Sequence, residues 1–164
     1  MRIGFGYDAH RLVPDTALVL GGIAIPHEYG LQGHSDADVV VHALCDAMLG
    51  AAALGDIGQH FPSTDDRWRG VSSLIILKAV ARLLAEHHYT LGNADVTIVA
   101  QRPRLAPYLP RMTTTLAATI NVEPAQLSIK ATTTDGLGFT GMEMGIAAYA
   151  ACLVGPLQAV AVSS

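Results

Sequence analysis

Alternating apolar and polar residues predict β-strands in three parts of the chain. Ile3, Phe5 and Tyr7 alternate with small or polar residues near the N-terminus, a period of two that is typical of a strand with one apolar face. The same period recurs at 95–98 and at 127–132. We therefore expect strands at these positions, the first with its apolar face packed against the core.

Two further segments give weaker signals. Residues 18–26 are apolar around a central Gly21-Gly22 pair, which predicts a short hairpin. Residues 145–154 are rich in alanine, which favours a helix, but they follow a glycine-rich turn, which allows a strand. The pattern alone leaves this last segment open.

Apolar residues recur with helical spacing in three other segments. Ser35 or Asp36 can cap a first helix that runs to about Leu49 or Ala53, before the turn at Gly55. The other two helices are predicted at 74–84, after a pair of serines, and at 109–120, with a stop at Asn121.

About four strands and three helices in mixed order predict an α+β fold. We expect a two-layer sandwich, in which an approximately four-stranded mixed sheet carries the helices on one face. No linker, repeat or low-complexity segment divides the sequence. Residues 1–164 are therefore expected to form a single domain.

The composition is too apolar for the surface of an ordinary monomer. Of 164 residues, 51% are hydrophobic and only 15% are charged, and the mean hydropathy is +0.36. The chain therefore either enters a membrane or covers much of its surface with copies of itself. The long uncharged stretch at 144–164 contains Gly155-Pro156 and has no basic flank, and the N-terminus has no apolar targeting core. We expect no membrane association but a cytoplasmic oligomer, whose interface takes up the excess of Ala, Val, Ile and Leu.

Charge and cysteine content exclude further classes. The net charge is −4, only Lys78 and Lys130 are lysines, and no basic stripe is interleaved with aromatic residues. Nucleic-acid binding is therefore not expected. Cys45 and Cys152 each lie among apolar residues. They are expected to be buried thiols in a reducing cytosol rather than a disulfide.

Three residues form a candidate metal site. Asp8 and His10 are two apart on the first strand and project from the same face, opposite the apolar one. His42 lies on the first helix, with Asp46 four residues later on the same helix face. One carboxylate and two imidazoles can hold Zn²⁺ tetrahedrally while leaving one position open for a substrate oxygen. Asp46 would then orient His42 as a hydrogen-bond acceptor.

Two segments beside the first helix are candidate ligand loops. Residues 33–38 open that helix, and free N–H groups at a helix N-terminus suit a phosphate. An ordinary cap by Asp36 explains the same residues. Residues 55–62 contain two glycines together with Asp56 and His60, and a plain turn is the alternative there.

Two later segments also suit a ligand. At 100–107 proline interrupts regular pairing, so freed backbone groups could contact a base while Arg104 meets phosphates. At 130–136 three threonines could bind phosphate oxygens, and Asp135 could hold a hard cation such as Mg²⁺ or Mn²⁺. Threonine is also a good strand former, which is the structural alternative.

Four motifs, in this order and spacing, resemble those of the 2-C-methyl-D-erythritol 2,4-cyclodiphosphate synthase family. They are Gly-Tyr-Asp-Ala-His-Arg-Leu at 6–12, Gly-His-Ser-Asp-Ala-Asp at 33–38 followed by His42, Leu-Gly-Asp-Ile-Gly-Gln-His-Phe-Pro at 54–62, and Lys-Ala-Thr-Thr-Thr-Asp-Gly-Leu-Gly-Phe-Thr-Gly at 130–141. The resemblance extends over residues 2–154. It implies a homotrimer with three active sites between neighbouring subunits, and a strand at 145–154.

The resemblance also assigns roles to residues. Asp8, His10 and His42 would bind zinc or another divalent cation, and His34 and Thr133 would stabilise the transition state. The methylerythritol phosphate end would be bound by Asp8, His10, His34, Ser35, Asp56, Ile57, Gly58, Phe61, Pro62, Ser63, Thr64 and Asp65. The cytidine diphosphate part would be bound by Ala100, Gln101, Arg102, Pro103, Arg104, Leu105, Ala106, Ala131, Thr132, Thr133, Thr134 and Asp135, with Phe139 as a lining residue.

The implied reaction is a phosphorus–oxygen lyase step of the non-mevalonate isoprenoid pathway. The 2-phosphate of 4-diphosphocytidyl-2-C-methyl-D-erythritol 2-phosphate would attack the β-phosphorus, closing the 2,4-cyclodiphosphate and expelling CMP. A phosphate is already anionic at neutral pH, so no strong general base is needed. Zinc, and Mg²⁺ or Mn²⁺ with the diphosphate near Asp135, would neutralise charge.

Two departures from the family bear on the alternatives. Asp135 stands where the family usually has glutamate, and Met142 stands where it usually has arginine. That arginine helps to bind a diphosphate ligand in the central channel of the trimer, so a trimeric isoprenoid-diphosphate-binding protein is disfavoured. A zinc-dependent phosphoester hydrolase keeps the same metal site but requires a placed base for water.

Overall fold

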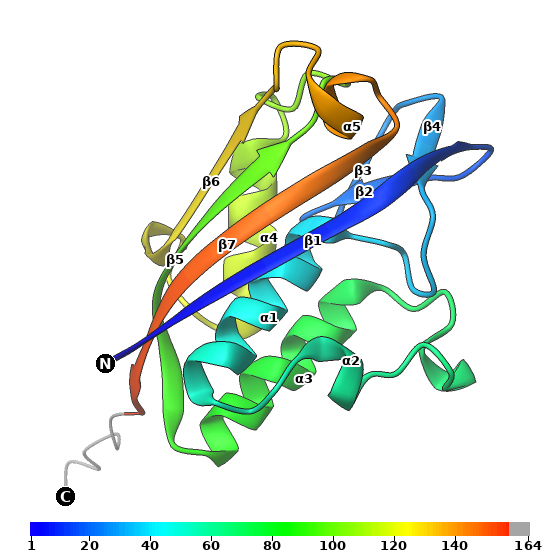
Figure 1. The fold of residues 1–164 in the computed structure, drawn as a ribbon. Helices are drawn as coiled ribbons and strands as arrows, with labels where there is room; N and C mark the ends of the chain where they lie inside the picture. The colour runs from blue at the N-terminus through cyan, green and yellow to red at the C-terminus, as the bar shows by residue number, and fades with distance from the viewer. Residues whose placement is uncertain (158–164) are drawn as a thin grey trace, which may run out of the picture.

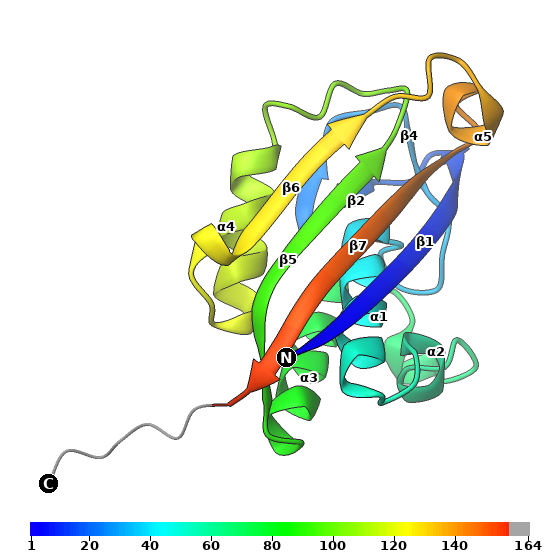
Figure 2. The same cartoon turned by 60° about the vertical axis from the view of Figure 1, so that its left-hand side comes forward.

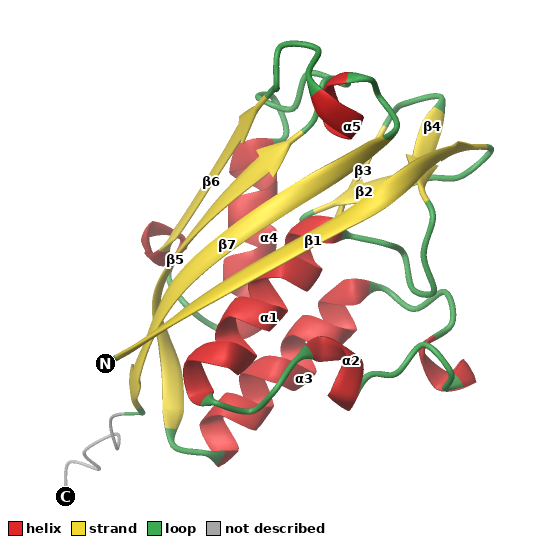
Figure 3. Cartoon of the chain, in the orientation of Figure 1, coloured by secondary structure: helices red, strands yellow, loops and turns green. Residues whose placement is uncertain are grey.

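A five-stranded mixed sheet forms one layer of the molecule (Figures 1 and 3). The computed structural model describes residues 1–157, so the predicted span to residue 164 extends beyond the described residues. In spatial order the strands are β4 (Tyr29–Leu31), β1 (Arg2–Pro14), β7 (Gly145–Pro156), β5 (Tyr89–Val99) and β6 (Leu127–Thr132). Strands β5 and β6 are parallel, and all other neighbours are antiparallel.

Three long helices form the second layer, and all of them lie on one face of the sheet (Figures 1 and 2). They are α1 (Val39–Ala52), α3 (Ser73–Glu86) and α4 (Leu109–Ile120). The shorter elements are β2 (Leu18–Leu20) and β3 (Ile23–Ile25), which pair as a hairpin, the helices α2 (Ile57–His60) and α5 (Gly138–Gly141), and 3₁₀ turns η1 (Asp66–Trp68) and η2 (Pro124–Gln126).

This architecture confirms the α+β class, the helices on one face, the hairpin and the strand at 145–154. The count of four strands is wrong, because β4 adds a fifth and its three residues are too few to show a period. Asn121 ends α4 as predicted, in the left-handed conformation with φ 57°. The segment at 55–62, expected as a loop, contains the short helix α2, which Asp56 caps by accepting from the Gln59 N–H.

Two glycines of β1 allow α1 to lie directly on the strand. A Cβ atom at Gly4 would be 1.8 Å from the carbonyl oxygen of Ala47, and one at Gly6 would be 2.0 Å from that of Ala43. Both distances are far inside van der Waals contact, so only glycine fits. The helix backbone therefore packs on the strand backbone, without a layer of side chains between them.

The expectation that Ile3, Phe5 and Tyr7 pack against the core is wrong. These side chains are 76%, 66% and 44% exposed, on the sheet face away from the helices. The core face of β1 is instead the glycine face, because larger side chains there would hold α1 away from the sheet. Asp8 and His10 follow the glycines on that same face and therefore lie on the helix side.

Asp38, rather than Ser35 or Asp36, caps α1. Its buried carboxylate accepts hydrogen bonds of 2.7–3.2 Å from four backbone N–H groups, those of Gly21, Gly22, Val40 and Val41. The cap also ties the β2–β3 hairpin to the helix. This carboxylate satisfies the N–H groups of Val40 and Val41, so those two groups are not free for a phosphate. Phosphate binding by the remainder of 33–38 stays a prediction.

The small apolar residues of α1 belong mostly to the core of the chain itself, since almost all of this helix is buried. Cys45 and Cys152 are free and buried, as predicted. Burial raises the pKa of both thiols, that of Cys152 to about 11. Within residues 1–157, no helix combines the length and the apolar character needed to cross a membrane.

Candidate metal centre and substrate site

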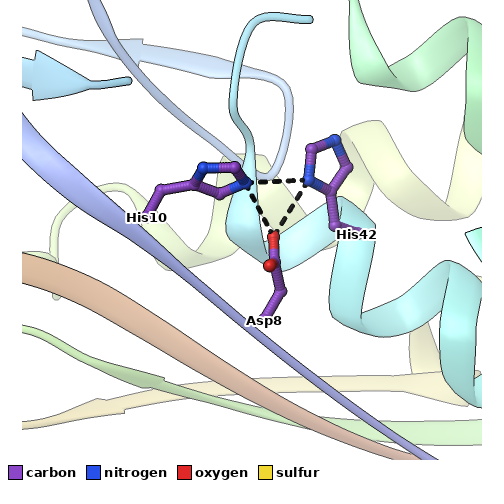
Figure 4. A group of neighbouring side chains, drawn as sticks. All are labelled: Asp8, His10 and His42. Carbon is purple, nitrogen blue, oxygen red and sulfur yellow. Dashed lines mark hydrogen bonds and ion pairs between the residues drawn. The ribbon is translucent and has the colours of Figure 1, made fainter. Parts of the chain in front are cut away.

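Asp8, His10 and His42 point toward one another between β1 and α1 (Figure 4). Oδ2 of Asp8 lies 3.1 Å from Nε2 of His10 and 2.9 Å from Nδ1 of His42, and the two nitrogens are 3.4 Å apart. The close packing of α1 on Gly4 and Gly6 brings His42 this near to the strand. The predicted juxtaposition of the three residues is confirmed.

The spacing of these three atoms fits a tetrahedral metal ion. Two ligands of tetrahedral zinc, each about 2.0–2.1 Å from the ion, lie about 3.3 Å from each other. The observed separations of 2.9–3.4 Å match that triangle. Two imidazole nitrogens and one carboxylate are also a donor set that zinc accepts. Three protein ligands leave a fourth position free, as in catalytic rather than structural zinc sites.

The shared hydrogen bonds keep Asp8 ionised, whereas a proton on His10 must leave before a metal ion binds. Burial acts to raise the pKa of Asp8, but hydrogen bonds from His10 and His42 outweigh burial and hold that pKa well below its usual range. The hydrogen bond to Asp8 raises the pKa of His10 despite burial. Nδ1 of His10 donates to the carbonyl oxygen of Gln32 at 2.7 Å. This bond leaves Nε2 directed at the site, where a metal ion would take the place of its proton.

The expected role of Asp46 beside His42 is wrong. Oδ1 of Asp46 accepts from the backbone N–H of Ile57 at 2.8 Å and so ties α1 to α2. Nε2 of His42 instead faces Oγ of Ser73 at 2.9 Å and Oγ of Ser35 at 3.2 Å. A helical spacing of four residues does not bring two side chains together when each has a nearer partner.

A cavity of about 270 Å³ opens beside the three ligands. Its lining contains five of the residues expected at the methylerythritol phosphate end in addition to the metal cluster, namely His34, Ser35, Ile57, Phe61 and Ser63. Nε2 of His34 lies 3.2 Å from the carbonyl oxygen of Asp65, which holds the ring at the cavity wall. Asp56, Gly58, Pro62, Thr64 and Asp65 belong to the same loops but are not part of this lining.

A second cavity, of about 470 Å³, lies at the ends of β5 and β6. It is lined by Ala100, Gln101, Arg102, Pro103, Arg104, Leu105, Ala106, Leu109, Ala131, Thr132 and Thr133. All residues expected to contact the cytidine diphosphate, apart from Thr134 and Asp135, are therefore gathered here. The two cavities share no lining residue. One chain thus holds the two expected halves of the substrate site apart.

The remaining predicted residues lie near the second cavity or beyond it. Thr133 donates to Oδ1 of Asp135 at 3.1 Å, and both are exposed. The Thr134 hydroxyl donates a hydrogen bond to the backbone carbonyl oxygen of Leu137. Phe139 lines a separate hollow of about 260 Å³ that also contains His10. Because His10 contributes to both this hollow and the metal cavity, the two are adjacent.

Four residues around the metal cavity were not expected from the sequence, and one of them, Ile76, adds an apolar side chain to the lining. Gln32 and Ser73 contact the outer nitrogens of the two histidines, and Trp68 lines the cavity, packed edge-on against Phe61. The Ser72-Ser73 pair signalled only a helix start. A carbonyl contact such as that of Gln32 has no side-chain signal in the sequence.

Three side chains that could hold a metal ion face an open cavity, an arrangement typical of metal-dependent enzymes. The profile of the YgbB family matches residues 1–155, and the chain belongs to that family. It is 58% identical over 154 residues to 2-C-methyl-D-erythritol 2,4-cyclodiphosphate synthase from Symbiobacterium thermophilum, covering 94% of this chain and 98% of the relative.

Solved structures share the fold. The chain is similar to a CDP-bound form of 2C-methyl-D-erythritol-2,4-cyclodiphosphate synthase, with 36% identity and a TM-score of 0.86 over 94% of this chain and 100% of the other. It is also similar to the bifunctional IspDF from Campylobacter jejuni, with 36% identity and a TM-score of 0.91. That match covers 94% of this chain but only 42% of the longer bifunctional one.

Proposed function

We propose that this protein is a cytoplasmic 2-C-methyl-D-erythritol 2,4-cyclodiphosphate synthase, formed by a single domain. It converts 4-diphosphocytidyl-2-C-methyl-D-erythritol 2-phosphate to the 2,4-cyclodiphosphate and CMP, as a phosphorus–oxygen lyase. The observation that carries the proposal is the Asp8–His10–His42 triangle opening into a cavity with His34. The 58% identity to a synthase of that name supports the substrate.

The residues of the chain position the substrate for an in-line displacement. An oxygen of the 2-phosphate forms a bond to the β-phosphorus, while the bond from that phosphorus to the bridging oxygen breaks and CMP leaves with its electrons. Zinc held by Asp8, His10 and His42 supplies Lewis-acid neutralisation of the phosphate charge when it is bound. His34 and Ser35 direct polar groups at the methylerythritol phosphate end, and Thr133 directs its hydroxyl at the diphosphate. Asp135 would hold Mg²⁺ or Mn²⁺ there, when either ion is bound.

The complete active site forms between subunits of a homotrimer. Two observations support this arrangement: the two halves of the site occupy separate cavities of one chain, and the helix-free sheet face exposes a group of large apolar side chains on β1 and β7. On that face Tyr7 packs against Tyr149 with ring centroids 4.9 Å apart, and Phe5 lies beside Tyr149. A patch of this kind is typical of a protein–protein interface. Burying it against neighbouring copies would bring the metal cavity of one subunit to the nucleotide cavity of the next.

The reaction products test the activity directly. Incubation of the protein with Zn²⁺, Mg²⁺ and the substrate is expected to give cyclic diphosphate and CMP in equal amounts. The two products are measured by ³¹P NMR. The controls are a reaction without substrate and a reaction with heat-inactivated protein. Release of inorganic phosphate without cyclic diphosphate would instead identify the hydrolase alternative, with water in the open metal position.

A charged residue on the apolar sheet face is expected to dissociate the trimer. Phe5→Glu places a carboxylate where an aromatic side chain would be buried, and an unpaired buried charge is strongly unfavourable. Light scattering is expected to give a mass of about three times 17.2 kDa for the natural chain and a mass of about a single chain for the variant. The variant should also lack activity. Arg82→Glu, on the exposed side of α3, is the matched control. A natural chain that is already monomeric would contradict the assembly.

A further inference from the structure

Ser73 connects a metal ligand to a carboxylate that lies outside the metal cavity. It is fully buried at the first turn of α3, and its Oγ lies 2.9 Å from Nε2 of His42. The same hydroxyl donates to Oδ1 of Asp36, and the backbone N–H of Ser73 donates to Oδ2 at 2.9 Å. Asp36 therefore holds Ser73 by two hydrogen bonds, while Ser73 contacts the outer nitrogen of His42.

The direction of these hydrogen bonds fixes which nitrogen of His42 carries the proton. An ionised carboxylate can only accept, so the single hydroxyl proton of Ser73 is committed to Asp36. The Oγ lone pairs that face His42 must then accept from Nε2–H. Neutral His42 with its proton fixed on Nε2 has its lone pair on Nδ1, which is the tautomer that a metal ion requires. A metal ion would then replace the second proton, which sits on Nδ1 when His42 donates to Asp8.

Helix capping and substrate contact do not account for this arrangement. The cap of α3 is Ser72, whose exposed side chain accepts from the Leu74 N–H. Ser73 is absent from the lining of the metal cavity, so it does not face the substrate. Ser35, the other hydroxyl near Nε2, lines the cavity and also accepts from the Ala37 N–H. Ser73 is thus the closer partner of Nε2 and the one that the fold orients.

We propose that Ser73 and Asp36 are positioning residues, which set the tautomer and ring orientation of His42 and thereby the affinity of the metal site. The inference rests on the proposed metal site. It joins three elements: the loop before α1, α1 itself and the start of α3. Removal of such outer contacts typically weakens metal affinity by about 10- to 100-fold.

Metal affinity of the apoprotein measures this role without the reaction. Zn²⁺ dissociation constants are determined at fixed pH by competition with a chromophoric chelator, for the natural chain, Ser73→Ala, Asp36→Asn and Ser72→Ala. Ser73→Ala is expected to weaken binding about 10- to 100-fold. Ser72→Ala, the same change one residue earlier, should stay within about twofold, because a lost cap affects the helix and not His42.

Asp36→Asn provides a second, nearly isosteric test. The asparagine oxygen can still accept from the Ser73 N–H, but its amide nitrogen then donates to Oγ. The Ser73 hydroxyl is thereby released to donate to Nε2, which favours the wrong tautomer of His42. We expect at least about tenfold weaker Zn²⁺ binding and a changed visible spectrum of the Co²⁺-loaded protein, with circular dichroism as the check on folding.

The outcomes separate this inference from the metal site itself. A natural chain that does not bind Zn²⁺ would overturn both. Tight binding by the natural chain together with unchanged affinity in Ser73→Ala and Asp36→Asn would overturn only the positioning role. Equal losses in Ser72→Ala and Ser73→Ala would also overturn it, because the effect would then belong to the helix start.

Discussion

A His42→Ala chain is expected to lose turnover by at least about 10³-fold, together with its tightly bound zinc, while keeping the oligomeric mass of the natural protein. Each 1.36 kcal/mol of transition-state stabilisation corresponds to a tenfold change in rate, and a Lewis-acid metal ion contributes several kcal/mol. His42 is one of only three residues in the metal triangle, so its removal leaves an incomplete donor set. The assembly should survive because His42 lies on the helix side of the sheet.

Metal content by elemental analysis, product formation by ³¹P NMR and mass by light scattering check the three parts of this prediction. His87→Ala is the matched control, since within residues 1–157 the side chain of this exposed histidine bonds only the Leu83 carbonyl, at the far end of α3. Zinc retained in His42→Ala at the level of the natural chain would show that the ligand assignment is wrong. Activity retained without zinc would show that the reaction does not use this site.

Mixing two inactive chains is expected to restore activity. His42→Ala damages only the metal cavity, and Thr133→Ala damages only the nucleotide cavity, which has no lining residue in common with the first. If each site takes one half from each of two neighbouring subunits, equal co-expression gives random trimers in which about a quarter of all sites have both halves intact. Turnover should therefore rise from near zero in either parent to about a quarter of the natural value.

The double variant His42→Ala/Thr133→Ala, co-expressed with the natural chain, controls for the number of intact chains. Random assortment then also leaves about a quarter of sites with both halves intact, so the two mixtures should be similarly active. No recovery from the two single variants, with activity retained in this control mixture, would mean that each chain builds its own complete site.

Periodicity was sufficient for most of the fold because the elements are long and regular. It failed at β4, where pairing with β1 and not local pattern creates a strand of three residues. It also misjudged β1, since apolar residues normally mark the buried face. There the close contact between the backbones of α1 and β1 outweighs the usual preference, and the aromatic side chains stay exposed on the opposite face.

The metal ligands were predictable because strand and helix spacing fixes which side chains share a face. Their supporting residues were not, because contacts between distant elements decide them. Ser35 and Asp36 have the composition of a helix cap, yet Asp38 performs that role and Asp36 reaches Ser73, 37 residues away. Asp46 has the right spacing from His42, but the α2 backbone lies closer to it.

The contact of α1 with Gly4 and Gly6 has a mechanical consequence for the metal centre. Where side chains separate a helix from a strand, a changed core volume shifts the helix by a corresponding distance. Here the peptide groups of α1 and β1 meet directly. The space between them, which fixes the Asp8–His42 distance, therefore contains no side chains that could repack. The distances between the three ligand atoms are therefore fixed by the contact between the two backbones. Substitutions elsewhere in the core can alter stability while leaving these distances unchanged.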